Sequence, residues 1–193
     1  TDGNVSVRVD DDRILCTPTQ VSKGFMDPAD LCAVDLAGHQ VGGQRPRTSE
    51  ILVHTAIYRR QAQARAVVHC HSPYGTAFAG LDEAPPREIY PEKEVWLGEI
   101  ARAPYRQSAT EELGAVVAPL ADRHPVILLA NHGVVTWGRS LEEAYWRVEM
   151  LEGYLQTVTI ARQYGGTLQS LTADQMKPIL ELKQRLGIVD PRL

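Results

Sequence analysis

The feature that most constrains the fold is a strand-like segment at the start of the chain that turns back on itself. Residues 5–9 alternate apolar and polar side chains, residues 10–12 are three aspartates, and residues 13–16 are again extended in character. This order predicts an antiparallel hairpin. A chain that begins in this way is expected to form a mixed α/β sandwich rather than a parallel sheet in which strands and helices strictly alternate.

Further strands are predicted where apolar and β-branched residues cluster between turn signals. They occupy residues 32–36, 66–71, 126–130 and 134–137. Helices are predicted where a capping residue precedes apolar residues at helical spacing. They occupy residues 50–64, a short segment from Ser72, and residues 110–123, 140–164 and 172–185, the last interrupted near Pro178. The length of 193 residues predicts a single domain, residues 1–193.

The charge balance argues against two classes of partner. The chain has 20 Lys and Arg against 24 Asp and Glu, which gives a net charge of -4, and its pI is near 5.9. Nucleic acids and anionic membranes are therefore not expected as partners. The longest apolar stretches, such as residues 126–130, are far shorter than the roughly 20 residues of a membrane span.

Cysteine usage suits a reducing compartment, and we expect a cytoplasmic protein. The three cysteines, Cys16, Cys32 and Cys70, are widely spaced and form no Cys-x-x-Cys pair. Neither a disulfide framework nor a structural zinc knuckle is expected from them. The chain starts at Thr1 and enters a turn at once, an opening that suits a segment from inside a longer gene product.

Three of the six histidines stand at positions suited to binding a cation. Alternate residues of a strand share one face, so His69 and His71 are expected to project the same way, with Cα atoms about 6.5–7 Å apart. Taken alone, the pair could equally be two histidines on a solvated strand face. His132 follows an apolar strand and precedes Gly133, where strand ends bring ligands together, although a lone histidine there is more often a core or turn residue. Three imidazoles with an open fourth position are the arrangement of a catalytic zinc site.

Glu50 is the fourth candidate site residue, because it stands in the first turn of a predicted helix. A carboxylate there can point into a cleft, and the alternative is that it only stabilises the helix dipole. His54 follows one turn later, and we expect it to support the site from behind or to pack in the core rather than to bind metal. His39 and His124 fall in turns and are expected to face solvent.

Five short motifs lie between residues 3 and 133, and the resemblance that they carry extends to the predicted long helix that ends near Tyr164. They are Gly3-Asn4-Val5-Ser6-Val7-Arg8, Thr17-Pro18-Thr19, Ser49-Glu50, Val68-His69-Cys70-His71 and His132-Gly133. In this order and approximate spacing the chain resembles the class II aldolase/adducin family, which includes aldolases and epimerases of sugar phosphates. The resemblance implies an α/β fold, a three-layer mixed sandwich with a largely antiparallel central sheet flanked by helices.

The resemblance also implies roles for the site residues. His69, His71 and His132 would bind Zn²⁺, or another divalent transition metal such as Mn²⁺ or Co²⁺. Glu50 would be the general base and acid at the carbon beside the substrate carbonyl, and Tyr90 would donate a proton to the aldehyde oxygen. Aldolases of this family carry glutamate at the acidic position and epimerases usually aspartate, so Glu50 favours carbon-carbon cleavage.

A phosphate pocket and a subunit interface are implied as well. The residues implied in the pocket are Asn4, Thr19, Thr48 and Ser49. The family is typically a homotetramer with active sites between subunits. Apolar residues of the long helix, such as Trp146, Leu151 and Tyr154, either supply such an interface or belong to the core of one subunit.

The chain departs from the sugar-phosphate members of the family at two places. Many of them have glycine where this chain has Gln20, whose side chain is expected to restrict the backbone and weaken phosphate binding. Residues 90–94, Tyr-Pro-Glu-Lys-Glu, place charges where those aldolases have mostly small or apolar residues. These charges either face the substrate or form a solvated loop face.

The function that we expect is that of a zinc-dependent lyase that cleaves a small hydroxy-carbonyl substrate by a retro-aldol reaction of the sugar-phosphate type. The alternative enzyme is a metal-dependent decarboxylase of a hydroxylated oxo or aromatic acid, which the two departures favour. A non-catalytic, adducin-like interaction module is the third possibility. It is disfavoured because a scaffold has no need of three histidines and a glutamate that are costly to bury unpaired.

Overall fold

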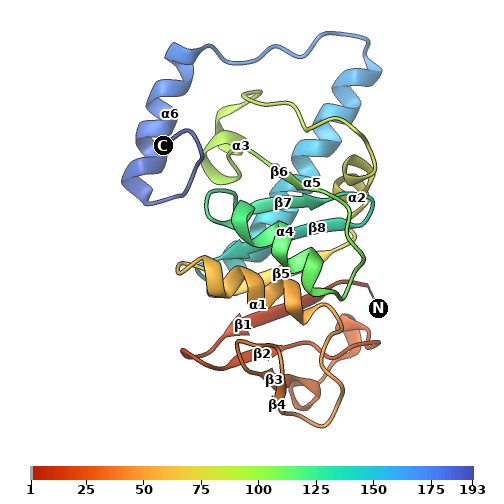
Figure 1. Cartoon of the computed structure of the whole chain (residues 1–193). Coiled ribbons are helices and arrows are strands. Elements are labelled where there is room, and N and C mark those ends of the chain that lie inside the picture. Colours follow the sequence, from red (N-terminus) through yellow and green to blue (C-terminus); the bar gives the residue numbers. More distant parts are fainter. Residues whose placement is uncertain (1) are drawn as a thin grey trace.

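An eight-stranded mixed sheet organises the computed structural model, which describes residues 2–193 (Figure 1). The strand order is β4-β3-β2-β1-β5-β8-β7-β6, and all neighbours pair antiparallel except β6 and β7, which are parallel. The strands are β1 (Asn4–Arg8), β2 (Ile14–Cys16), β3 (Cys32–Val34), β4 (Gln40–Gly42), β5 (Ala66–Cys70), β6 (Ala101–Ala103), β7 (Val126–Leu129) and β8 (Gly133–Gly138). The predicted hairpin is confirmed, because β1 and β2 pair antiparallel with Val7 opposite Leu15.

Helices cover both faces of the sheet, so the molecule has three layers (Figure 1). One face is covered by α1 and α4, which pack against each other, and the other face by α2 and α5. The helices are α1 (Ile51–Arg60), α2 (Pro73–Ala79), α3 (Pro91–Trp96), α4 (Glu111–Ala121), α5 (Leu141–Gln163) and α6 (Ala173–Leu186). This arrangement confirms the mixed sandwich with a largely antiparallel sheet that the sequence predicted.

The central strand β5 shows why the predicted strands form here. Its side chains alternate between the two faces. Val67 joins the core beneath α1 and α4, whereas Ala66 and Val68 pack against α5. With β1 on one side and β8 on the other, β5 has both edges paired and both faces covered, which explains its continuous apolar run.

Local capping chemistry defines the two C-terminal helices. The Ser140 hydroxyl accepts a hydrogen bond from the backbone N–H of Glu143 at the start of α5. Thr172 forms a capping box at the start of α6. The predicted interruption near Pro178 is wrong, since α6 continues through this residue. Pro178 lies on the exposed side of the helix, where water can satisfy the carbonyl that its missing N–H leaves free.

Two strands and one α-helix were not predicted, namely β4, β6 and α3, and neither was the short 3-10 helix Lys23–Phe25. Two of the three apolar residues on the long helix also belong to the core, because Leu151 and Tyr154 are fully buried. Their use as evidence for a tetramer is therefore wrong. Trp146 is 59% exposed and is the one of the three that lies at the surface.

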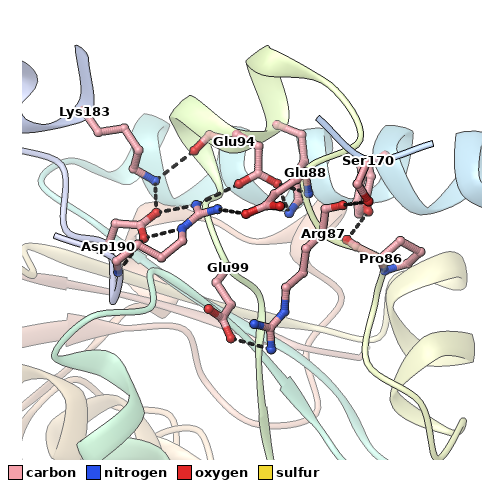
Figure 2. Close-up of polar contacts among 11 residues, drawn as sticks. Pro86, Arg87, Glu88, Glu94, Glu99, Ser170, Lys183 and Asp190 are labelled. Atoms are coloured by element: carbon pink, nitrogen blue, oxygen red, sulfur yellow. Dashed lines mark hydrogen bonds and ion pairs between the residues drawn. The ribbon is translucent and has the colours of Figure 1, made fainter. Parts of the chain in front are cut away.

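The charged residues of the 90–94 segment include two that are buried rather than facing substrate or solvent. Lys93 and Glu94 of α3 pair at 2.7 Å and are almost fully buried. Glu94 also accepts from Arg192 at 2.7 Å, and Asp190 pairs with both Arg192 and Lys183, at 2.8 and 2.7 Å. Figure 2 shows Lys183 of α6 placed between Asp190 and Glu94. This ionic cluster of five residues joins α3, α6 and the C-terminal segment.

Within residues 2–193 no helix is long and apolar enough to cross a membrane. Cys16, Cys32 and Cys70 are free thiols, and the first two are buried in the core.

Candidate metal centre and active site

Three imidazole rings converge at one edge of the sheet. His69 is in β5, His71 follows directly after it, and His132 lies in the turn between β7 and β8. The antiparallel pairing of Cys70 with Val134 brings the end of β5 beside the start of β8, so the turn carries His132 next to the other two rings. Ring centroids are 5.1, 4.8 and 5.0 Å apart. Each residue offers one ligand atom, and these atoms lie within 4.8 Å of one another.

Two glycines permit this close packing. A Cβ on Gly133 would lie 2.7 Å from the carbonyl oxygen of Cys70 and 2.8 Å from a ring carbon of His71. Gly3 has a φ of +73°, and a Cβ there would lie 2.5 Å from the carbonyl oxygen of His69. Any side chain at either position would displace the histidine strand.

Glu50 faces the histidines rather than its own helix. It occupies the N-cap position of α1 without a side-chain capping bond. Its Oε2 lies 3.1 Å from Nε2 of His69, and its Oε1 lies 3.2 Å from Nε2 of His132. The carboxylate therefore spans two of the three imidazoles, and the alternative that it only stabilises the helix dipole does not describe its contacts.

The tautomer of His69 and the lowered pKa values of its two neighbours suit a bound cation. Nδ1–H of His69 donates to the carbonyl oxygen of Val134 at 2.8 Å, so in the neutral ring the lone pair lies on Nε2. This nitrogen is buried without a hydrogen-bond partner among the described residues, and it faces a Glu50 oxygen. Burial and the neighbouring His69 also lower the pKa of His71 and His132, which favours neutral, metal-binding imidazoles. Three such nitrogens suit a divalent transition metal.

Asn4 completes the surroundings of the carboxylate. Its Nδ2 donates to Oε2 of Glu50 at 2.9 Å. Burial opposes ionisation of Glu50, but the imidazoles of His69 and His132 and the hydrogen bond from Asn4 outweigh it, and the pKa of Glu50 falls to about 2. Glu50 is therefore a carboxylate at neutral pH, ready to accept a proton.

The remaining histidines lie elsewhere. His54 is fully buried behind Asn4, with both ring nitrogens hydrogen-bonded within the protein, as expected of a supporting residue. His39 is exposed beside Asp35, as predicted. The prediction that His124 faces solvent is wrong, because this residue is half-buried and its Nδ1 donates to the carbonyl oxygen of Leu120.

Backbone pairing brings together the two segments that carry Thr19, Thr48 and Ser49, three of the four residues assigned to a phosphate pocket. The N–H of Thr48 donates to the carbonyl of Thr17, and the N–H of Thr19 to the carbonyl of Pro46, at 3.1 and 3.0 Å. The hydroxyl of Thr48 accepts from the N–H of Glu50, and the neighbouring Ser49 is exposed. The Thr-Pro-Thr turn is thus fastened to the segment that enters α1.

Gln20 does not restrict the backbone as the sequence led us to expect. It adopts a φ of +58°, in the left-handed region that glycine favours. A non-glycine residue holds this conformation at a cost of roughly 1–2 kcal/mol. The chain therefore keeps a glycine-like path at this turn, and the backbone argument against phosphate binding is wrong.

Tyr90 stands apart from the other predicted site residues. Its ring packs against Tyr154 with centroids 5.7 Å apart. In the part of the chain that the structure describes, no hydrogen bond, ion pair or ring contact joins Tyr90 to Glu50 or to the three metal-site histidines. Burial and the charge of Glu92 raise the pKa of its phenol.

The sequence reasoning missed two partners of the site, Ser6 and Tyr58. Both hydroxyls lie within hydrogen-bond distance of each other, and that of Ser6 reaches His54. The signal was present in the spacing. His54 and Tyr58 follow Glu50 at intervals of four residues on one helix face, and Ser6 shares a strand face with Asn4.

Comparison with known proteins shows the family to which the chain belongs. A sequence model described as "Class II Aldolase and Adducin N-terminal domain" matches residues 1–159. The chain belongs to the class II aldolase/adducin family. It is similar to an L-fuculose phosphate aldolase of Methanococcus vannielii, with 41% identity over 151 residues that cover 78% of this chain and 80% of the relative.

Two further relatives extend the comparison. A 3-oxo-tetronate 4-phosphate decarboxylase of Pectobacterium atrosepticum is 34% identical over 178 residues, which cover 90% of this chain and 80% of the relative. The solved structure of an L-fuculose 1-phosphate aldolase superposes with a TM-score of 0.87 at 25% identity, covering 97% of this chain and 87% of the other. This member of the family is a class II aldolase-type enzyme, with relatives named both for aldol cleavage and for decarboxylation.

Proposed function

We propose that this enzyme is a zinc-dependent lyase that acts on a small phosphorylated hydroxyketone by a retro-aldol reaction. It breaks the bond between the carbon next to the carbonyl group and the hydroxyl-bearing carbon that follows. The observation that carries the proposal is the Glu50 carboxylate, held against two of three convergent imidazoles at 3.1 and 3.2 Å. A divalent cation held by His69, His71 and His132 would stabilise the negative charge that develops on the carbonyl oxygen.

The two reactions named for the relatives, aldol cleavage and decarboxylation, would leave the same enediolate. Retro-aldol cleavage of a ketose 1-phosphate removes a proton from the hydroxyl of the departing carbon, which leaves as an aldehyde, and the bonding pair remains as an enediolate. Decarboxylation of a 2-hydroxy-3-oxo acid 4-phosphate releases carbon dioxide and leaves the same enediolate. Protonation at carbon then yields dihydroxyacetone phosphate in both cases. One site with a proton-transfer group beside this carbon could serve either reaction, and the decarboxylase is our second candidate because that relative aligns over 90% of the chain.

Glu50 is the group that we assign to the proton transfer at carbon. It is ionised at neutral pH, which is the form that removes the proton from carbon in the direction of aldol addition. In the direction of cleavage it must first take up a proton and then return it to this carbon. Its two oxygens face the metal-site nitrogens where the substrate carbonyl would lie. Asn4, Thr19, Thr48 and Ser49 are assigned to substrate binding. The left-handed backbone at Gln20 supports a close approach of the phosphate to this turn.

Tyr90 is assigned to proton transfer at the oxygen of the departing carbon. It would take up the hydroxyl proton in cleavage and donate it to the aldehyde oxygen in the reverse reaction, and we propose that it acts across a subunit boundary in a homotetramer. The support is geometric, because Tyr90 packs on Tyr154 and has no contact with Glu50 in its own chain. The exposed Trp146 remains available at the surface for such an assembly. The three free thiols support a reducing, cytoplasmic location.

The test is a direct assay of two probe substrates. Purified protein, with its metal content measured, is incubated with L-fuculose 1-phosphate or with 3-oxo-tetronate 4-phosphate, and dihydroxyacetone phosphate and carbon dioxide are quantified. We expect dihydroxyacetone phosphate without carbon dioxide from the first substrate. Turnover of the second alone would replace the aldolase assignment by the decarboxylase. Metal-loaded protein that turns over neither substrate would overturn the proposed substrate class.

A further inference from the structure

A chain of buried polar groups leads from the back of α1 to Glu50. The Tyr58 hydroxyl lies 2.8 Å from Oγ of Ser6, and Oγ of Ser6 lies 2.7 Å from Nδ1 of His54. Nε2 of His54 lies 2.6 Å from Oδ1 of Asn4, whose Nδ2 donates to Glu50 at 2.9 Å. Ser6, His54 and Tyr58 are each at most 2% exposed. None of these three has a place in the mechanism proposed above.

The direction of these hydrogen bonds follows from the Glu50 carboxylate. A carboxylate only accepts, so the amide of Asn4 must turn its NH₂ toward Glu50 and its oxygen toward His54. Nε2 of His54 must then carry the proton, and Nδ1 must accept from the Ser6 hydroxyl. From the Ser6 hydroxyl onward, each hydrogen bond of the chain is therefore donated in the direction of Glu50. With its proton on Nδ1 instead, His54 would turn an unprotonated nitrogen toward Asn4. Either this nitrogen would then face the amide oxygen of Asn4, or, with the amide turned round, that oxygen would face the Glu50 carboxylate.

His54 can keep this arrangement because it stays neutral. Burial lowers its pKa to about 3, with a further contribution from His69. Leaving a buried imidazole nitrogen or amide oxygen without a partner is costly. His54 thus holds the amide of Asn4, and this amide in turn holds the Glu50 carboxylate.

We propose that His54 is a positioning residue, which sets the orientation of Asn4 and through it the placement of the Glu50 carboxylate over the metal-site imidazoles. The inference rests on the proposed function, since it acts on the group assigned to proton transfer. It adds to that function a buried chain of Ser6, His54 and Tyr58 that touches neither metal nor substrate. Removing a hydrogen-bond partner that lies behind a metal site typically lowers activity by roughly 10- to 100-fold.

The principal test replaces His54 by Phe, which keeps a ring in the buried position and removes both hydrogen bonds. We expect turnover of the accepted probe substrate to fall by about 10- to 100-fold, with metal content unchanged. Thr55→Val is the matched control. Thr55 is the next residue of α1 and equally buried, but its hydroxyl donates only to the nearby carbonyl of Leu52. The control should keep wild-type turnover.

A double-mutant cycle separates positioning from a general loss of structure. In the Glu50→Gln background, His54→Phe should cause no further loss, because the group through which it acts is gone. Equal losses in both backgrounds, or no loss in the wild type, would overturn the positioning role. If Glu50→Gln itself leaves turnover intact, the proposed function of Glu50 fails instead, so the two failures are distinguishable.

Two measurements keep the inference testable if His54→Phe does not fold or if neither probe is turned over. Ser6→Ala removes the contacts of the Ser6 hydroxyl with His54 and Tyr58. Because only the bond to His54 is directed toward Glu50, turnover should fall about fivefold, the worth of one hydrogen bond. Nitrogen-15 spectra of histidine in the protein as purified should show His54 neutral with its proton on Nε2 from pH 5 to pH 9. A proton on Nδ1, or a charged His54, would refute the assigned direction of the chain.

Discussion

Replacing Asp190 by Asn tests whether the ionic cluster holds the C-terminal segment to the rest of the protein. Asp190 is fully buried and pairs with Lys183 at 2.7 Å and with Arg192 at 2.8 Å. Arg192 would keep Glu94 as a partner at 2.7 Å, but Lys183 would retain neutral acceptors in place of a carboxylate, namely the backbone carbonyl of Glu94 and the amide oxygen of the introduced Asn. A buried ammonium without a carboxylate costs about 3–5 kcal/mol.

The assay is urea unfolding followed by circular dichroism. We propose that residues 1–193 form one domain, so a single transition is expected, shifted to lower urea by the full 3–5 kcal/mol, an approximate value for a broken buried pair. Asp122→Asn is the matched control. Asp122 pairs with Arg60 at 2.6 Å, but both side chains are partly solvated, so the same substitution should change stability much less.

The pH dependence follows from the lowered pKa of Asp190. Burial would raise this pKa, but the hydrogen bonds from Arg192 and Lys183 and the charge of Lys183 bring it well below the usual 3.8. A carboxyl group with a lowered pKa stabilises the folded state above its unfolded pKa and loses this effect as the pH falls through the folded value. The difference between wild type and Asp190→Asn should thus be constant from pH 5 to pH 8 and shrink below pH 4. A difference under 1 kcal/mol at pH 7, about that of an exposed pair, would refute the reasoning.

Three further predictions concern the active site. Glu50→Gln should lower turnover by roughly 10²- to 10⁴-fold while metal content, measured by elemental analysis, changes little; His69→Ala should instead strip the metal, and an Ala variant with stoichiometric metal would contradict the assigned ligand. Mixing inactive Glu50→Gln and Tyr90→Phe proteins and allowing subunits to exchange should restore up to about a quarter of wild-type activity, because half of the sites supply Glu50 and half of those face an intact Tyr90. No recovery in exchanged oligomers would show that Tyr90 does not act across a subunit boundary, and an active Tyr90→Phe protein would place Tyr90 outside the site. Gln20→Gly should leave thermal stability and KM nearly unchanged, since relief of the left-handed backbone offsets the added freedom of the unfolded chain. A large decrease in KM would instead show that the Gln20 side chain obstructs the substrate.

Short-range patterns in the sequence were sufficient for much of the framework. Alternation predicted the hairpin of β1 and β2, and β-branched residues predicted β5. Capping residues marked the starts of α5 and α6. These signals are local, since each depends on residues within one or two turns of helix or on one strand. For the same reason the shared face of His69 and His71 could be predicted.

The tertiary structure decided what depends on partners far apart in the chain. Nothing local marks Ala101–Ala103 as a strand, and it becomes one by pairing with β7. Lys93 and Glu94 have the composition of a solvated loop, yet they are buried because Asp190 and Arg192 supply compensating charges about a hundred residues later.

For the candidate active site, too, the sequence determined some features and the tertiary structure determined others. The sequence by itself determined which residues could bind a cation, because His69, His71, His132 and Glu50 carry that chemistry wherever they lie. Only the tertiary structure determined that Glu50 turns to two of the imidazoles and that Asn4 holds it there. Orientation depends on hydrogen bonds whose partners lie 46 and 50 residues apart, and no short-range pattern encodes such distances.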